Sequence, residues 1–168
     1  MDIEQTKRSR TVTWEDPFIV PKAAVGRSGL EILKDVFEGR LPPPPIAQTM
    51  GFHGVHVEAG KAVFAGEPGE HLYNPIGVVH GGFAMTLLDS AMGCAVHSTL
   101  KAGERYTSVE VKTNFIRPIT IETGPVRCEG VVIHRGGTIA TAEGKLFAEN
   151  SGKLLAHGTT TCLIVPAR

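Results

Sequence analysis

The chain of 168 residues has the length of one domain, or of one domain with an extension, and its 42% hydrophobic and 20% charged residues are typical of a globular protein. Seventeen basic and seventeen acidic residues give a net charge of zero, so there is no strong positive field and we expect no nucleic-acid partner. No apolar run is long enough to span a bilayer and the first ten residues are polar, so we expect a cytoplasmic protein with no secretory signal and no membrane insertion.

Residues 1–45 are predicted to form an extension that precedes the main domain, residues 46–168. The first 26 residues have few periodic apolar positions, so we expect them to lie loosely on the surface, pinned by Trp14 and Phe18. The prolines at positions 42–45 are expected to be extended, because proline cannot continue a helix.

A short helix is predicted over residues 29–38 of this extension. Ser28 and Glu31 have the spacing of a capping box at its start, and Gly39 is a natural stop at its end.

A hairpin is predicted from two strands, residues 51–58 and 61–67. His53 and His56 lie in its first strand, where residues three apart point to opposite faces, so we expect that they do not bind one metal ion. The three cysteines are far apart in the sequence, which indicates neither a disulfide framework nor a zinc site.

A long apolar helix is predicted after His80-Gly81-Gly82, and we expect the rest of the chain to fold around it. Its residues leave almost no polar face, and such a helix belongs inside a protein: Phe83, Met85, Leu87, Leu88, Ala91, Met92, Cys94 and Val96. Asp89 in its middle is therefore expected to be buried. A buried carboxylate is costly unless it is hydrogen-bonded or used, so Asp89 is either a structural acid or part of a functional site. The glycine-lined start of the helix favours a functional site.

Four antiparallel strands are predicted after this helix, at residues 107–116, 124–134, 138–149 and 154–165. Alternation in the first strand puts Ser108 on its polar side, opposite the face that carries Val109, Val111, Thr113 and Phe115. The third strand has a face of small residues on which a helix can lie closely: Ala140, Ala142, Gly144, Leu146 and Ala148. Such a sheet can bury one face by curling around the helix, which predicts an α+β fold.

Several motifs follow one another between residues 46 and 165: Asn74, His80-Gly81-Gly82, Leu88-Asp89, Gly93, Asn114-Phe115-Ile116-Arg117-Pro118, Arg135-Gly136 and Gly152-Lys153-Leu154-Leu155-Ala156. Together they resemble the PaaI-like branch of the hotdog-fold acyl-CoA thioesterases. The resemblance implies a hotdog fold, which is an antiparallel β-sheet wrapped around a long central α-helix. An N-terminal extension, here helical, also occurs in that branch.

The resemblance implies catalytic roles for five residues. Asp89 matches the family's catalytic acid, which acts as general base on water or as nucleophile on the thioester. Gly81 matches the glycine whose backbone N–H polarises the thioester carbonyl. Asn74 and His80 match residues that hold the carbonyl or the water, and Ser108 lies where some members carry a serine that positions the water.

Further positions are expected to bind the substrate, an acyl-CoA. Gly82 lies at the glycine-lined start of the helix, and Phe83, Met85 and the N-terminal helix are candidates to line an acyl pocket. Coenzyme A carries phosphates, so cationic contacts are expected at the mouth of the cleft, at Arg117, at Arg135 with its neighbour Gly136, or at Lys112. The resemblance implies no metal and no cofactor beyond the coenzyme A of the substrate.

Helix geometry indicates how the site is assembled. Gly81 and Asp89 are eight residues apart, which is about 12 Å along a helix, whereas a base must come within about 3 Å of its proton or reach it through one water. If both groups act on one thioester, Asp89 comes from a second chain, as it does in the hotdog family. We therefore expect a homodimer with two shared active sites, or a tetramer of such dimers.

Two other functions remain open beside thioester hydrolysis. One is a non-catalytic acyl-CoA-binding module of the same fold, and the other is a hotdog hydratase or dehydratase. The acyl group stays undetermined, because aromatic and aliphatic chains both fit the sequence.

Overall fold

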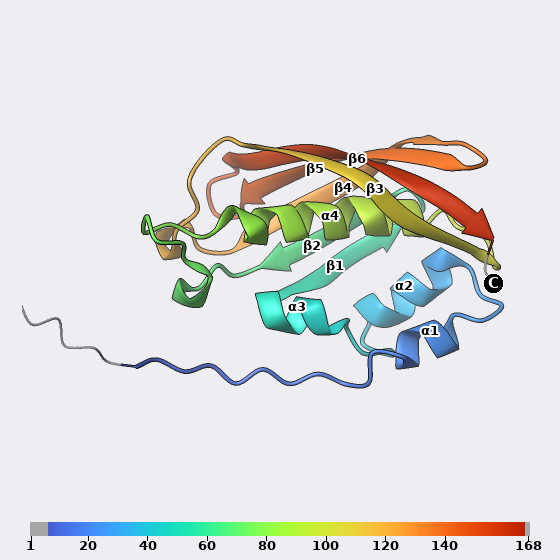
Figure 1. Ribbon diagram of the computed structural model, residues 1–168, viewed down its shortest axis with the longest axis horizontal. Helices are drawn as coiled ribbons and strands as arrows, with labels where there is room; N and C mark the ends of the chain where they lie inside the picture. The colour runs from blue at the N-terminus through green and yellow to red at the C-terminus, as the bar shows by residue number, and fades with distance from the viewer. Residues whose placement is uncertain (1–6, 167–168) are drawn as a thin grey trace, which may run out of the picture.

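A computed structural model describes residues 7–166 as one long helix, α4, packed against a six-stranded antiparallel sheet, with three shorter helices before it (Figure 1). The predicted α+β architecture is confirmed. The strand order is β1-β2-β4-β5-β6-β3, so β1 and β3 form the two edges. The helices are α1 (Ile19–Ala23), α2 (Gly29–Phe37), α3 (Pro45–Met50) and α4 (Gly81–His97), with 3-10 turns η1 (Glu70–Leu72) and η2 (Ile121–Thr123). The strands are β1 (Phe52–Glu58), β2 (Lys61–Gly66), β3 (Glu104–Phe115), β4 (Val126–Arg135), β5 (Ile139–Ala148) and β6 (Leu154–Pro166).

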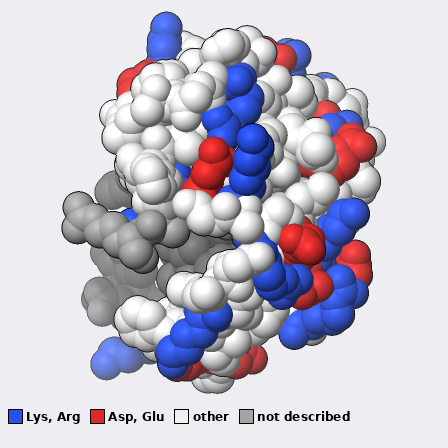
Figure 2. All heavy atoms as spheres, turned by 90° about the vertical axis from the view of Figure 1, so that its right-hand side faces the viewer, with Lys and Arg blue, Asp and Glu red and all other residues white. Residues whose placement is uncertain are grey.

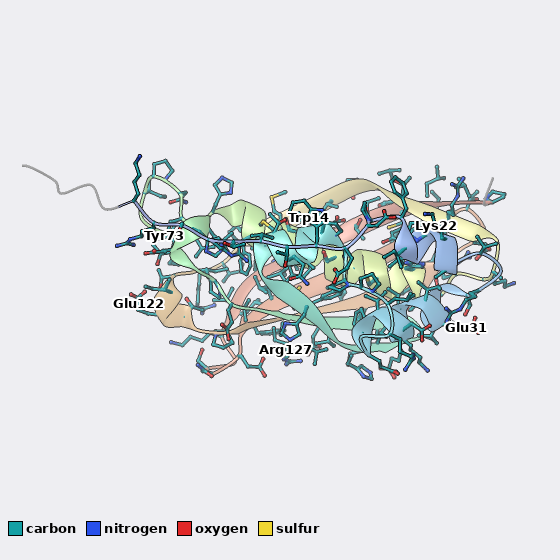
Figure 3. The ribbon with its side chains drawn as sticks, turned by 90° about the horizontal axis from the view of Figure 1, so that it is seen from below. Trp14, Lys22, Glu31, Tyr73, Glu122 and Arg127 are labelled. Atoms are coloured by element: carbon teal, nitrogen blue, oxygen red, sulfur yellow. The ribbon has the colours of Figure 1, made fainter. Side chains whose placement is uncertain are left out.

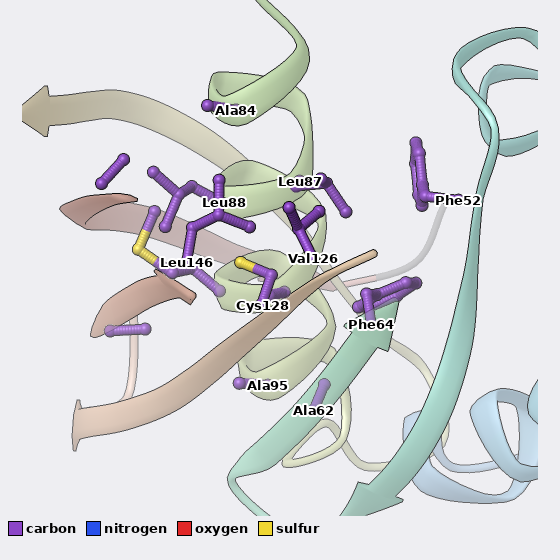
Figure 4. Packing of buried hydrophobic residues seen from close by; sticks show 14 of the residues in the cluster. Phe52, Ala62, Phe64, Ala84, Leu87, Leu88, Ala95, Val126, Cys128 and Leu146 are labelled. Carbon is purple, nitrogen blue, oxygen red and sulfur yellow. The ribbon is translucent and has the colours of Figure 1, made fainter. Parts of the chain in front are cut away.

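The sheet lies against α4 because two glycines let the backbones approach closely. An ideal Cβ on Gly130 of β4 would lie 2.2 Å from the carbonyl oxygen of Ala91, and one on Gly144 of β5 would lie 2.9 Å from Cγ of Met92. Leu87 and Leu88 of α4 fill the space between helix and sheet (Figure 4). The small-residue face predicted for the third of the later strands is therefore confirmed as the surface that receives the helix.

The capping box predicted for α2 is also confirmed. The side chain of Ser28 accepts a hydrogen bond from the Glu31 N–H, and the Glu31 carboxylate accepts one from the Ser28 N–H at 2.8 Å. The helix packs on β1, where an ideal Cβ on Gly54 would lie 2.6 Å from the ring of Phe37. The capping box thus sets where α2 begins, and the contact between Phe37 and Gly54 sets where the helix packs on β1.

Two features of the extension differ from expectation. The proline run is extended only as far as Pro44, and Pro45 begins α3, because proline is compatible with the first helical position. Trp14 and Phe18 do not pin the chain by burial, since they are 58% and 64% exposed, and residues 19–23 form the short helix α1. The first six residues, for which we also expected a loose path, lie outside the described residues.

A bulge in β1 changes the placement of two histidines. The register shifts between Gly54 and His56, so His53 pairs with Ala65 and His56 with Val63, which are alternate residues of β2. Both imidazoles therefore lie on the same outer face, and the expectation of opposite faces is wrong. Within residues 7–166, no group of three His, Cys, Asp or Glu side chains is arranged to hold a metal ion.

The face of α4 that points away from the sheet is open in the single chain. Met85 is 42% exposed and Asp89, one turn later, is also exposed, whereas Phe83, Leu87 and Leu88 are buried. The expectation that Asp89 is buried in the chain is therefore wrong, because the sheet covers only one side of the helix. None of the helices described has the combination of length and apolar character needed to cross a membrane.

Candidate active site

The N-terminus of α4 presents a free backbone donor. His80 is the N-cap with an extended backbone, and its Nδ1 accepts a hydrogen bond of 2.9 Å from the Gly82 N–H. Phe83 N–H donates to the carbonyl of His80. Among residues 7–166, the N–H of Gly81 has no hydrogen-bond acceptor. This donor lies at the positive end of the helix dipole, where a developing negative charge is stabilised.

The loop before the helix is ordered by Asn74. Its Oδ1 accepts hydrogen bonds from Ile76 N–H at 3.1 Å and Val78 N–H at 3.3 Å, and its own N–H donates to the Val78 carbonyl. Gly77 supplies the positive φ of 81° that closes this turn. Asn74 therefore fixes the path of the chain into His80 and Gly81.

A cavity of about 420 Å³ opens at this point, and we call it the Gly81 cavity. Its walls are formed by Asn74 and its loop, by Gly81 and Ala84 of α4, by residues 115–119 and by Leu155 and Ala156. The structure thus brings four of the predicted site residues, Asn74, His80, Gly81 and Arg117, to the wall of one cavity. Arg117 donates to the carbonyl of Leu154 at 2.6 Å, which holds the guanidinium at the cavity wall.

Phe115 lines this cavity, although the sequence predicts no site role for it. An ideal Cβ on Gly81 would lie 2.9 Å from Cζ of Phe115, so the aromatic ring covers the glycine directly. The ring is 56% exposed. Its position in the Asn114-Phe115-Ile116-Arg117-Pro118 motif was the only signal, because alternation alone assigns Phe115 to the core.

Asp89 and Ser108 form a second cluster. The Ser108 hydroxyl donates to Asp89 Oδ1 at 3.1 Å. Alternation predicts that Ser108 lies on the polar side of its strand, but β3 has a bulge at Val109. Ser108 therefore pairs with the buried Cys162 and faces α4, while Val109 is 57% exposed. The bulge turns the serine toward the carboxylate.

Other polar groups beside this cluster are poor nucleophiles. Burial, with a smaller contribution from the charge of Asp89, raises the pKa of the Cys94 thiol to about 12, so the thiol is protonated at neutral pH. Burial also raises the pKa of Tyr106 well above its usual value. An ideal Cβ on Gly93 would lie 2.7 Å from the Tyr106 hydroxyl, so this glycine makes room for the phenol one turn after Asp89. The carboxylate is thus the basic group of this cluster.

The Asp89 cluster and the Gly81 cavity are separate in one chain. Gly81 and Asp89 lie eight residues apart on the straight part of α4, about 12 Å by helical rise. Two residues of β3 are separated in the same way, because Phe115 contacts Gly81 and Ser108 contacts Asp89. One chain therefore carries two half-sites along the same helix and strand.

The remaining predicted substrate contacts are placed as follows. Gly82 donates its N–H to Nδ1 of His80 and is not among the residues that line the Gly81 cavity. Phe83 is only 1% exposed and lies in the core. Arg135 Nη2 lies 2.7 Å from Glu104 Oε2, at the opposite end of β3 from Phe115, and another of its N–H groups donates to the Gly136 carbonyl. At that end of the molecule acidic and basic side chains are intermixed (Figure 2).

Comparison with known proteins shows which protein family this chain is similar to. Residues 76–155 match the sequence model of the thioesterase superfamily. A protein of Saccharolobus solfataricus named as a candidate esterase is 33% identical over 100 residues, 60% of this chain and 69% of the relative. A 1,4-dihydroxy-2-naphthoyl-CoA hydrolase of Listeria monocytogenes is 28% identical over 123 residues, 73% of this chain and 98% of the hydrolase.

A solved structure agrees with these sequence matches. A point mutant of the phenylacetic acid degradation protein PaaI of Thermus thermophilus aligns with a TM-score of 0.64 at 28% identity. The alignment covers 71% of this chain and 97% of PaaI. The resemblance to PaaI-like proteins seen in the sequence motifs is therefore confirmed at the level of fold and family.

Proposed function

This chain belongs to the thioesterase superfamily and is by homology a thioester hydrolase, and we propose that it hydrolyses an acyl-CoA to the free acid and coenzyme A with Asp89 and the Gly81 N–H as the reacting groups. The observation that carries the proposal is the pair of half-sites on α4. One offers an N–H that has no acceptor among the described residues, at a helix N-terminus beside a cavity, and the other offers a carboxylate held by Ser108.

The Gly81 N–H is suited to bind the thioester oxygen. The carbonyl oxygen gains negative charge in the transition state, and a fixed donor at a helix N-terminus stabilises that charge without reorganisation. Loss of one such donor costs on the order of 10²–10³ in rate. Asn74 and His80 support this role by fixing the loop and the first turn of the helix.

The Asp89 carboxylate is suited to activate water. As general base it takes a proton from a water molecule while the water oxygen bonds to the carbonyl carbon. The carbon–sulfur bond then breaks, and the thiolate of coenzyme A leaves and receives the proton. In the alternative, the carboxylate itself attacks the carbonyl carbon, the carbon–sulfur bond breaks and the thiolate of coenzyme A leaves. Water then hydrolyses the resulting mixed anhydride, which regenerates the carboxylate and supplies the proton that the thiolate takes up. Ser108 orients the carboxylate in either case.

The edge strand β3 supports a homodimer in which the two half-sites meet. Among the described residues its outer edge has no neighbouring strand, and such a free edge favours pairing with another strand. Val111 and Lys112 lie midway between Ser108 and Phe115. Antiparallel pairing of two β3 strands about this midpoint would bring Gly81 of one chain to Asp89 of the other, and two-fold symmetry would make two sites. Pairs of such dimers would give the expected tetramer.

A panel of CoA esters tests the proposed activity. The Listeria relative is named for an aromatic acyl-CoA, so the panel includes aromatic and aliphatic acyl groups. We expect the wild-type protein to release free thiol from at least one ester, and Asp89→Ala to bind that ester without turnover. Binding without thiol release by the wild type would identify a binding module, and hydration of enoyl-CoA without thiol release would identify a hydratase.

A further inference from the structure

A second cavity lies beside the Gly81 cavity, and nothing in the proposed hydrolysis uses it. We call it the Arg10 cavity. It has a volume of about 640 Å³ and is lined by the N-terminal segment, by η1 and by two residues that lead to the Gly81 cavity: Arg8, Ser9, Arg10, Glu70, His71, Tyr73 and Ile121. Figure 3 shows the N-terminal segment crossing the lower face of the molecule, with Tyr73 near its beginning.

Arg10 is held in place but keeps its charge. Its guanidinium donates to the carbonyls of Thr49 at 2.7 Å and Gln48 at 3.0 Å, and lies 2.8 Å from Nε2 of His71. These partners are neutral acceptors, and no carboxylate within residues 7–166 forms an ion pair with Arg10. A guanidinium has five N–H donors, and three are used here, so two remain for a ligand. Among the described residues, Arg10 is therefore a fixed cation without a carboxylate partner at the wall of the cavity.

The other charged groups of the cavity leave it positive. Arg8 forms an ion pair with Glu70, and both side chains are largely exposed. Burial and the charge of Arg10 both lower the pKa of His71, so the imidazole is neutral at neutral pH and can accept from Arg10. Within the part of the chain that the structure describes, one carboxylate thus faces two guanidinium groups at this cavity. An anionic ligand would compete with Glu70 for Arg8 and would meet Arg10 without competition.

The linings of the two cavities follow each other in the chain at Tyr73 and Asn74. The Tyr73 hydroxyl accepts a hydrogen bond of 3.0 Å from the Ile121 N–H, so both residues are fixed at the wall of the Arg10 cavity. The next residue, Asn74, lines the Gly81 cavity, and so does Ile119, whose carbonyl accepts from the Val79 N–H. A ligand with its thioester at Gly81 can therefore continue past Tyr73 toward the two arginines.

We propose that the Arg10 cavity binds the phosphate-bearing nucleotide end of the acyl-CoA whose thioester lies at Gly81, with Arg10 and Arg8 as the phosphate contacts. This inference rests on the proposed function. It assigns the cationic contacts to the N-terminal extension, whereas Arg135 is engaged with Glu104 at the far end of β3.

A comparison of two substrates tests the assignment. One is a CoA ester that the wild type hydrolyses, and the other is the pantetheine thioester of the same acyl group, which lacks the nucleotide. Arg10→Ala and Arg8→Ala should each raise KM for the CoA ester by about tenfold or more, the effect of losing one hydrogen bond to a charged group, and leave KM for the pantetheine thioester unchanged. Equal effects on both substrates would mean that Arg10 only anchors the extension and would overturn the inference.

Two further variants separate ligand binding from structure and from general electrostatics. Arg127→Ala removes the same charge at a site distant from Tyr73 (Figure 3), where Arg127 pairs with Glu149, and should leave both KM values unchanged. Glu70→Gln frees Arg8 and should lower KM for the CoA ester alone. If Glu70→Gln raises that KM, the ion pair serves the fold and the assignment of Arg8 fails.

Direct binding distinguishes this inference from the proposed hydrolysis. Adenosine 3′,5′-bisphosphate carries phosphates of the coenzyme's nucleotide without the pantetheine arm, and calorimetry should detect its binding to the wild type and a loss of about tenfold in affinity with Arg10→Ala. No binding, or equal binding by both proteins, would overturn the inference even if CoA esters are hydrolysed. Failure to hydrolyse any ester, with binding intact, would overturn only the proposed function.

Discussion

The hydroxyl of Ser108 on β3 donates a hydrogen bond of 3.1 Å to the carboxylate of Asp89 on α4. The contact depends on the bulge at Val109, which turns Ser108 toward the helix. It holds one oxygen of a carboxylate that is exposed in the single chain.

Substitution of these two residues should separate the reacting group from the group that positions it. We expect Asp89→Asn to lower kcat for CoA-ester hydrolysis by about 10²–10⁴, the usual contribution of a positioned acid or base. Ser108→Ala removes only the orienting hydrogen bond and should lower kcat by about tenfold. Steady-state kinetics measures both effects, with Thr107→Ala as the matched control, because Thr107 is an exposed hydroxyl residue on the same strand. An active Asp89→Asn enzyme would remove Asp89 from the mechanism.

Mixing two inactive chains should restore activity if the sites are shared. Gly81→Pro removes the backbone donor, and Asp89→Asn removes the carboxylate. In a mixed dimer one site would contain both defects and the other would contain neither, so we expect partial recovery after the two proteins are unfolded and refolded together. The free thiol released from a CoA ester is the readout. A mixture that remains as inactive as its components, despite demonstrated mixed dimers, argues that each site belongs to one chain.

The close approach of α4 to the sheet predicts unequal effects at two glycines. Gly130→Ala places a Cβ 2.2 Å from the backbone oxygen of Ala91, which cannot move alone, so we expect a loss of about 3 kcal/mol in the free energy of unfolding. Gly144→Ala meets the flexible side chain of Met92 at 2.9 Å and should cost about 1 kcal/mol. Urea unfolding of both variants measures the difference. Equal losses would show that the helix shifts as a rigid body in both cases.

The stability of the protein should depend on pH through His97. Burial lowers the pKa of this imidazole in the folded state, so between the folded and unfolded pKa values the unfolded chain binds more protons. The neutral imidazole's contribution is fully present above about pH 6.5 and is lost as the pH falls through the folded pKa. We expect His97→Gln to lose less stability than the wild type between pH 7 and pH 5 in urea unfolding. His53→Gln, a substitution at an exposed position, serves as control. If the free energy of unfolding of all three proteins changes with pH in the same way, His97 is excluded as the cause.

Local signals in the sequence determined several elements. The capping box of Ser28 and Glu31 marks the start of α2, because its two hydrogen bonds join residues only three apart. The apolar run after His80-Gly81-Gly82 gives α4, and the small residues of β5 give the face on which α4 lies. These features follow from periodicity and from short-range chemistry, both of which can be read along one segment.

The tertiary structure alone decided the orientation of the site residues. The bulges at Val55 and Val109 arise from pairing with β2 and β6, and each shifts the alternation by one residue, so His56 and Ser108 face opposite to the predicted direction. The exposure of Asp89 depends on which side of α4 the sheet covers. The two cavities join segments that are distant in sequence, such as Arg10 with His71. The sequence shows the periodicity of apolar and polar residues along one strand or helix. Long-range packing sets the register between strands and the distance between helix and sheet, and this register and distance decide where each side chain points.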